Sequence, residues 1–287
     1  AYDRTCPEVG GTEGAEPLEK YQPKLPVYDD TETFGSEIES QYSVLISVDD
    51  GEVIASRNSL ARMYPASMTK IMSLIVAVEH IENLDDTFTM TFEIINPLYL
   101  QNATVTGLTS GETVPISDLL YGAILPSGAD ATDALAIYTA GDSETFVGWM
   151  NDKAEELGLK DTHFTNTSGL HDENHYTTAY DMAVILDYAM HNDVCREVLG
   201  RMKHTTVSTE AHPNGVEMYS TMYNKIHRDQ IDGVEIIGGK TGYTYQAGHC
   251  LASCAEKNGK LYIAVTGGGE TKYSPIYDVI EMFSEFI

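Results

Sequence analysis

The sequence predicts an α/β (α+β) protein in which strands from both ends of the chain form an antiparallel sheet and a helical lobe is inserted between them. Two observations support this prediction. Short β-rich runs joined by tight turns occur near the start and again in the last third, and the middle third has helical periodicity. A cleft is expected where the two parts meet.

The 287 residues, of which 42% are hydrophobic, are enough for one large domain or a main domain with a small lobe. Residues 1–40 are rich in Gly, Pro, Glu and Asp and have no hydrophobic period, which predicts a flexible N-terminal tether. The folded domain is therefore expected over residues 41–287, with its helical lobe at about 85–200.

The first strands are predicted at YSVLISV and EVIAS, which an Asp49-Asp50-Gly51 turn joins into a hairpin. A buried helix is predicted from Pro65, because Pro suits a helix start and apolar residues then recur at helical spacing. These apolar residues are Ile71, Leu74, Ile75, Val78 and Ile81.

Several helices are predicted between about Ser117 and Asp193. Ser143 is the expected N-cap of one of them, and Thr177 or Thr178 of another. The last third returns to strands at GVEIIGG, AGHCLASCAEK and KLYIAVTGGG, with an Asn258-Gly259 turn before the last of these and a closing helix after it.

Charge excludes one class of function. The 44 acidic and 17 basic side chains give a net charge of -27, which repels phosphate backbones and anionic headgroups, so nucleic acid is not an expected partner. No apolar run of about 18 residues could span a bilayer. The first residues lack a signal-peptide pattern, so the protein is either cytosolic or a leader has been removed.

Cysteine usage predicts no disulfide framework, since the four cysteines are scattered and no Cys-x-x-Cys pair occurs. Cys250 and Cys254 fall on one predicted strand about 13 Å apart, too far to bond to each other.

Ser67 and Lys70 form the first candidate catalytic pair. A spacing of three places the hydroxyl and the amine on one face of the predicted helix. A serine is a poor nucleophile until a base takes its proton, and a lysine in apolar surroundings can act as that base. The helix N-terminus adds backbone donors. Ser-x-x-Lys alone also fits an ordinary helix-surface pair.

Two further segments are informative because of their order along the chain after Ser67 and Lys70. Ser127-Gly128-Ala129 lies in a turn between two apolar helices, where a hydroxyl could relay a proton or merely cap a helix. Gly238 to Tyr243 lies on a late strand, where Lys240 and Thr241 offer donors to a carboxylate. Each segment is common, but all three in this order and context are improbable by chance.

This set of motifs resembles the penicillin-recognising serine enzymes, and specifically the low-molecular-mass penicillin-binding proteins of the serine D-alanyl-D-alanine carboxypeptidase type. The likeness runs from about Tyr42 to Ile287. It is carried by YPASMTKIMS, GLTSGETVPISDLLYGAILPSGADATDALA, FTNTSGLHDENHYTTAYDMAVIL and IIGGKTGYTYQAGHCLAS.

The resemblance implies a β-lactamase/transpeptidase-like fold, with residues 41–287 as a penicillin-binding catalytic domain. It implies an enzyme that removes the terminal D-alanine from peptidoglycan pentapeptides ending in D-Ala-D-Ala, and β-lactams as covalent inhibitors. It further implies an extracytoplasmic location after removal of a signal peptide, and no metal or organic cofactor.

The resemblance also assigns roles to residues. Ser67 would be the acylated nucleophile, Lys70 its base and Ser127 the proton relay. Lys240, Thr241, Gly242 and Tyr243 would bind substrate, and the backbone amides of Ser67 and Tyr243 would form the oxyanion hole. Lys272 is a weaker candidate for the terminal carboxylate, since a solvated surface lysine is the commoner case.

One position departs from the family pattern: Ala129 replaces the usual Asn of the middle motif. The lost hydrogen bonds would cost about 1–3 kcal/mol in the transition state, roughly a ten- to hundredfold in rate. The alternative to an active carboxypeptidase is therefore a low-turnover peptidoglycan-binding protein. A DD-endopeptidase is also open, and a β-lactamase is disfavoured because no Glu-x-x-Leu-Asn run occurs between the second and third motifs.

The cluster LHDENH contains His171, Asp172, Glu173 and His175, but its lack of helical periodicity favours a structured loop near the cleft over a zinc site. Asn166 and Gly169, just before it, are expected to shape the floor of the cleft or to serve only as turn residues.

Overall fold

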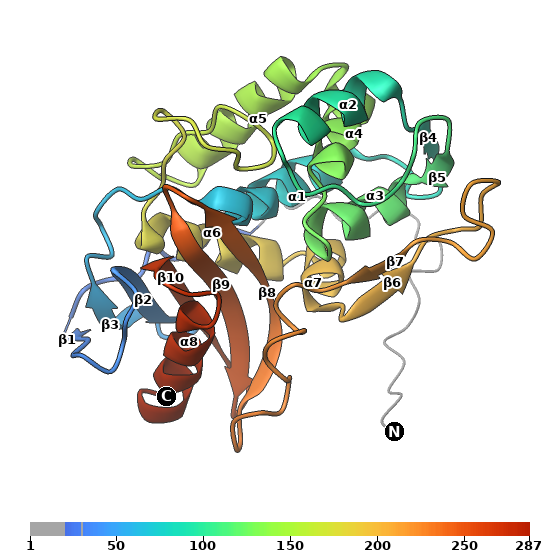
Figure 1. The fold of residues 1–287 in the computed structure, drawn as a ribbon. Coiled ribbons are helices and arrows are strands. Elements are labelled where there is room, and N and C mark those ends of the chain that lie inside the picture. Colours follow the sequence, from blue (N-terminus) through green and yellow to red (C-terminus); the bar gives the residue numbers. More distant parts are fainter. Residues whose placement is uncertain (1–20, 30) are drawn as a thin grey trace.

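The computed structural model describes residues 21–29 and 31–287. Its main sheet has the strand order β1-β3-β2-β10-β9-β8 and is antiparallel except for the β1–β3 pair (Figure 1). The strands are β1 (Glu32–Thr33), β2 (Tyr42–Ser47), β3 (Glu52–Arg57), β8 (Glu235–Thr244), β9 (Gly248–Lys257) and β10 (Lys260–Gly269). The prediction of an antiparallel sheet built from both ends of the chain is thus confirmed.

The helices fill the middle of the chain and its end. They are η2 (Ala66–Met68, a 3₁₀ turn), α1 (Thr69–His80), α2 (Phe92–Leu100), α3 (Ile116–Ile124), α4 (Ala129–Ala140), α5 (Ser143–Glu156), α6 (Ala179–Met190), α7 (Asp193–Gly200) and α8 (Ser274–Glu285). Two small hairpins accompany them, β4 (Thr87–Thr89) with β5 (Thr113–Pro115) and β6 (Lys203–Thr205) with β7 (Glu217–Tyr219).

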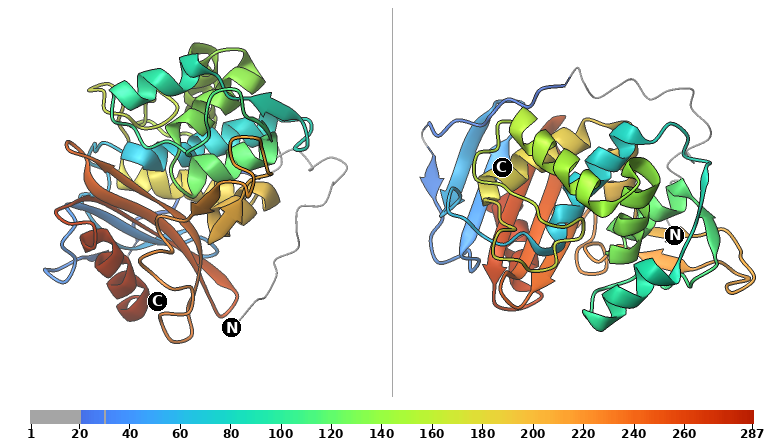
Figure 2. Two further views of the ribbon diagram at one scale, coloured as in Figure 1. Left: turned by 45° about the vertical axis from the view of Figure 1, so that its right-hand side comes forward. Right: turned by 90° about the horizontal axis from the view of Figure 1, so that it is seen from above.

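The sheet separates two apolar cores, because successive side chains of a strand point to opposite faces. Val44 and Ile46 of β2 face the core that contains α1, α6 and the helical lobe. Leu45, between them, faces the core that contains Val279 and Phe283 of α8. Figure 2 shows α8 on the face of the sheet opposite the helical lobe.

Helix α1 is the central element of the larger core. All its residues from Thr69 to Ala77 are buried, as its apolar sequence predicts. The chain enters it through η2, whose N-cap is Pro65. Ser67 therefore lies in the 3₁₀ turn that leads into α1, with Lys70 in the first turn of α1 itself.

The Asn258-Gly259 turn is confirmed. Both residues have positive φ (53° and 76°), as a two-residue hairpin turn requires, and Lys257 pairs with Lys260 across it. Thr178 caps α6, since its hydroxyl accepts a hydrogen bond from the Asp181 amide at 2.9 Å.

The predicted N-cap Ser143 is wrong. Asp142, one residue earlier, caps α5 by accepting from the amide of Thr145 at 2.7 Å. Asp and Ser are comparable caps, so the residue types alone could not distinguish two adjacent positions.

Residues 1–20 of the predicted tether lie outside the described residues. From Tyr21 onward the described chain contacts the domain: the Tyr21 hydroxyl donates to Asp187 at 3.0 Å, and Phe34 and Ile38 are buried in the core beside α8. The carboxylate of Asp278 on α8, itself buried, accepts from the amides of two further residues of this segment, Glu39 and Ser40, at 2.8 Å each.

Three of the four cysteines lie in the described residues, and all three are buried free thiols. No helix in this part of the chain is long and apolar enough to cross a membrane.

We predict that Asp278→Ala lowers the free energy of unfolding by about 1–3 kcal/mol, because it leaves two buried amides without an acceptor. Urea unfolding monitored by circular dichroism would measure this. Glu281→Ala, a partly exposed carboxylate on the same helix, serves as the control. Equal unfolding midpoints for the two variants would contradict the prediction.

Candidate active site

Ser67 and Lys70 lie together at the junction of η2 and α1. The Lys70 amine contacts the Ser67 hydroxyl at 3.0 Å and donates to the backbone carbonyl of Ser168 at 2.7 Å. Both residues line a small cavity of about 80 Å³, which Ser127, Ala129 and residues 168–170 also border. The structure thus brings the first two sequence motifs to one cavity.

Burial controls the chemistry of Lys70. The side chain is only 2% exposed, and this desolvation lowers its pKa to about 7, against the opposing charges of Asp133 and Asp130. A substantial fraction of the amine is therefore neutral near pH 7. The neutral amine has a lone pair that can accept the Ser67 proton across the 3.0 Å contact.

Ser127 has an unusual backbone conformation and a hydroxyl that is unpaired within the described chain. Its φ of 70° lies in the left-handed region, which a serine rarely occupies. Its hydroxyl is buried and has no hydrogen-bond partner among the described residues. Because Ser127 lines the cavity, an approaching group could supply the missing partner.

The third motif lies on β8, next to η2. Tyr243 lines the small cavity, whereas Lys240, Thr241 and Gly242 do not. Gly242 explains how the elements fit, since an added Cβ would lie 2.9 Å from the Pro65 carbonyl oxygen and 3.1 Å from the Ser67 nitrogen. Only a residue without a side chain lets β8 pass this close to η2.

Lys240 is almost completely buried, and its amine donates to the carbonyl of Thr241 at 2.8 Å. Burial, together with the positive charges of Lys70 and Lys225, holds its pKa well below the ordinary value for lysine. The Thr241 hydroxyl hydrogen-bonds that of Thr221 at 2.6 Å.

The 166–169 loop forms one wall of the cavity. The Asn166 side-chain oxygen accepts from the amides of Ser168 and Gly169 at 3.2 and 2.7 Å, so Asn166 shapes this loop. Gly169 has a φ of 85°, and a Cβ there would overlap the Ala66 carbonyl oxygen. The loop thus presents the Ser168 carbonyl to Lys70.

Sequence reasoning missed Ser168 and Asp133. The role of Ser168 is carried by its backbone carbonyl, which no residue type reveals. Asp133 lies one turn after Asp130 on α4 and accepts from Thr167 at 2.7 Å. In the sequence, only its position after the second motif pointed to Asp133. That spacing does not predict which residue Asp133 contacts.

Both ring nitrogens of His175 form hydrogen bonds within the protein. Its Nδ1 accepts from the Thr165 amide at 3.0 Å, so its Nε2 carries the proton and donates to Thr69 at 2.8 Å. Burial lowers its pKa to about 4, so the ring is neutral. Among the described residues no group of His, Cys, Asp and Glu could hold a metal ion. Lys272 borders neither the cavity of Ser67 nor the groove described below.

Comparison with known proteins identifies the family. The sequence profile of the D-alanyl-D-alanine carboxypeptidase family, Peptidase S11, matches residues 29–271. The chain belongs to this family. The resemblance inferred from the three motifs is confirmed.

Two carboxypeptidases similar to this chain are DacF of Bacillus subtilis and DacA of Escherichia coli, each 33% identical over 81% of the chain. The chain spans only 58% and 57% of their respective lengths. The D-alanyl-D-alanine carboxypeptidase of Streptomyces sp. strain K15 is 31% identical, over 74% of this chain and 75% of its own.

Solved structures support the same fold. The crystal structure of the Streptomyces K15 DD-transpeptidase matches with a TM-score of 0.77 and 27% identity, over 86% of this chain and 96% of that one. DacD of Francisella tularensis matches with a TM-score of 0.72 and 25% identity, over 84% and 68%. The predicted transpeptidase-like fold is therefore confirmed.

We predict that the Lys70 amine titrates with a midpoint near pH 7, being protonated below it and neutral above it. NMR of side-chain-labelled lysine would measure the titration, and Lys70→Met would assign the signal. Lys260, whose pKa is raised by its contact with Asp50, is the internal control and should not titrate in this range. A Lys70 midpoint as high as that of Lys260 would contradict the prediction.

Proposed function

We propose that this protein is a serine D-alanyl-D-alanine carboxypeptidase of the bacterial cell envelope, with Ser67 as its nucleophile. Its substrate would be the peptidoglycan pentapeptide ending in D-Ala-D-Ala. The observation that carries the proposal is the buried Lys70 amine, which contacts the Ser67 hydroxyl and has a pKa near 7. Membership of the family supports the reaction.

The reaction begins when neutral Lys70 takes the proton of Ser67. The Ser67 oxygen forms a bond to the carbonyl carbon of the penultimate D-alanine, giving a tetrahedral intermediate. The bond to the terminal D-alanine nitrogen then breaks, and that nitrogen receives a proton through Ser127. Water next cleaves the acyl-enzyme ester, which releases the shortened peptide and regenerates the Ser67 hydroxyl.

Negative charge on the tetrahedral intermediate needs donors already in place. We assign this role to the backbone amides of Ser67 and Tyr243, which belong to the closely packed η2 and β8. Two such donors in a water-poor site stabilise the transition state more than the planar carbonyl of the substrate.

Lys240 and Thr241 would hold the terminal carboxylate of the substrate. Burial, and to a smaller extent the nearby amines of Lys70 and Lys225, disfavours the protonated form of Lys240 in the free protein. A bound carboxylate would supply the opposite charge and favour protonation. Substrate binding would therefore be coupled to proton uptake at this lysine.

The chief alternative is a low-turnover penicillin-binding protein. Ala129 is buried, and it contributes to its surroundings through its backbone amide, which donates to Thr104 at 2.8 Å. It has no side-chain amide for Lys70 or the substrate. Covalent inhibition by β-lactams would accompany either function, because it requires only the acylation step. Endopeptidase action on cross-links is a second alternative, and β-lactamase action is the least favoured.

We predict that the protein is labelled covalently by a fluorescent penicillin and releases D-alanine from a D-Ala-D-Ala peptide. Ser67→Ala should abolish labelling and lower release at least about a thousandfold, because no acyl-enzyme can form. Intact mass and a coupled D-alanine assay measure the two activities. Ser73→Ala, at a buried serine of α1 that does not line the small cavity, is the control. Labelling without release would favour the low-turnover alternative, and labelling that survives in Ser67→Ala would refute the assignment.

We further predict that Ala129→Asn raises the rate of D-alanine release about tenfold, by restoring hydrogen bonds worth about 1 kcal/mol or more in the transition state. The kcat/KM for a D-Ala-D-Ala peptide measures this, with Ala129→Leu as a control for size alone. If Asn and Leu lower the rate equally, Ala129 is a packing requirement of this site and not a weakened motif.

A further inference from the structure

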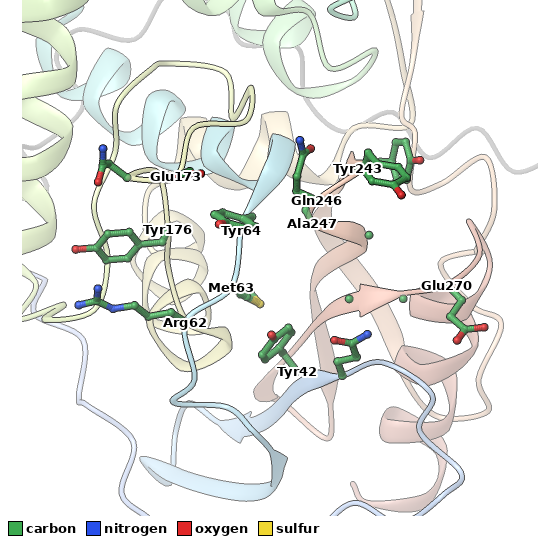
Figure 3. Close-up of a pocket in the computed structure, with 16 residues that line it drawn as sticks. Tyr42, Arg62, Met63, Tyr64, Glu173, Tyr176, Tyr243, Gln246, Ala247 and Glu270 are labelled. Atoms are coloured by element: carbon green, nitrogen blue, oxygen red, sulfur yellow. The ribbon is translucent and has the colours of Figure 1, made fainter.

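A second and larger hollow lies beside the active site. It has a volume of about 670 Å³ and is bordered by the start of β2, the segment before η2, the 173–176 loop, the β8–β9 turn and the end of β10 (Figure 3). Five tyrosines line it: Tyr42, Tyr64, Tyr176, Tyr243 and Tyr245. We call it the tyrosine groove. Its size suits a ligand as large as a sugar with part of a peptide.

The tyrosine groove is next to the small cavity of the active site, since Tyr243 lines both. Strand β8 runs from Lys240 past Gly242, beside Ser67, to Tyr243 and then to the β8–β9 turn. With the terminal carboxylate at Lys240 and the scissile carbonyl at Ser67, the rest of the substrate leads along β8 toward Tyr245. This step rests on the proposed function.

The stem peptide of the proposed substrate is long enough to extend along β8 beyond the small cavity. An extended peptide advances about 3.3 Å per residue, so three or four residues upstream of the scissile bond span roughly 10–13 Å. Strand β8 continues two residues beyond Gly242, and the turn that follows it contains Gln246, which lines the groove. In peptidoglycan the residue at that point is attached to an N-acetylated amino sugar, so this sugar would arrive in the groove.

The side chains of the groove suit such a sugar. Tyr243 and Tyr245 are 56% and 89% exposed, which offers ring faces for the C–H surface of a sugar and phenol groups for its hydroxyls. Gln41, Asn174 and Gln246 add side-chain amides that can pair with an acetamido group.

The charges of the groove favour a largely neutral ligand. Arg62 lies over the Tyr176 ring at 4.1 Å and pairs with Asp161 at 3.2 Å. Glu173 and Glu270 also border the groove, so it has no excess of positive charge to capture an anion. Figure 3 shows Arg62 beside Tyr176, with Glu270 on the opposite side.

We propose that the tyrosine groove binds the N-acetylated amino sugar that carries the stem peptide. The enzyme would then recognise stems attached to glycan in preference to free peptides. The groove acts through binding and lies outside the reacting atoms.

The test compares two substrates that differ only in the sugar: N-acetylmuramyl-pentapeptide and the same pentapeptide with an acetylated N-terminus. We expect kcat/KM for D-alanine release to be about five- to tenfold higher with the sugar, as one or two aromatic contacts would give. Tyr245→Ala should bring this ratio close to one, and Tyr245→Phe should keep most of it. Tyr277→Ala, an exposed tyrosine of α8 outside the groove, is the control and should leave the ratio unchanged.

A ratio near one in the unaltered protein, or an equal loss on both substrates in Tyr245→Ala, would overturn the sugar site while leaving the carboxypeptidase activity intact. Absence of release from both substrates would instead refute the proposed function. In that case a binding experiment tests the sugar site. Saturation-transfer NMR would measure contact between the Ser67→Ala protein and N-acetylmuramyl dipeptide, which lacks D-Ala-D-Ala. Transfer that Tyr245→Ala removes supports the site, and absence of transfer overturns it.

Discussion

The burial of the Lys70 amine against the Ser67 hydroxyl is the interaction on which the site depends. Removing a lysine from water disfavours its charge, and here this lowers its pKa to about 7. The hydrogen bond to the Ser168 carbonyl and the charges of Asp133 and Asp130 offset part of that desolvation. Stronger opposing charges would keep the amine protonated, so the neutral fraction that the proposed base requires depends on this balance.

Close backbone packing creates this environment. Four separate segments meet around Lys70: η2 with α1, the loop before α4, the 166–169 loop and β8. Gly169 and Gly242 let two of these segments approach η2 more closely than any side chain would permit. Water is excluded from the amine as a result, and the low dielectric that shifts its pKa follows from the fit of the backbones.

In the proposed function the two hollows have different roles, one in the reaction and the other in binding the far end of the substrate. The small cavity contains Ser67 and Lys70, the proposed reacting groups, while the tyrosine groove lies farther along β8 and is larger. Its walls come from residues as far apart in sequence as Gln41 and Glu270. A tyrosine in such a sequence is typical of core packing, and only its place in the fold shows it at a surface groove.

The sequence by itself determined the elements whose cause is local. The turn at Asn258-Gly259, the buried face of α1 and the Ser67–Lys70 spacing follow from residue type and period, and the ordered motifs identified the family. Only the tertiary structure decided the features that depend on long-range contacts. These are the packing of residues 31–40 against α8, the left-handed backbone conformation of Ser127, and the contact of the Ser168 carbonyl with Lys70. Local periodicity indicates which face of an element is apolar. The position of a backbone carbonyl cannot be predicted from residue types, and the close approach of distant segments depends on how the whole chain packs.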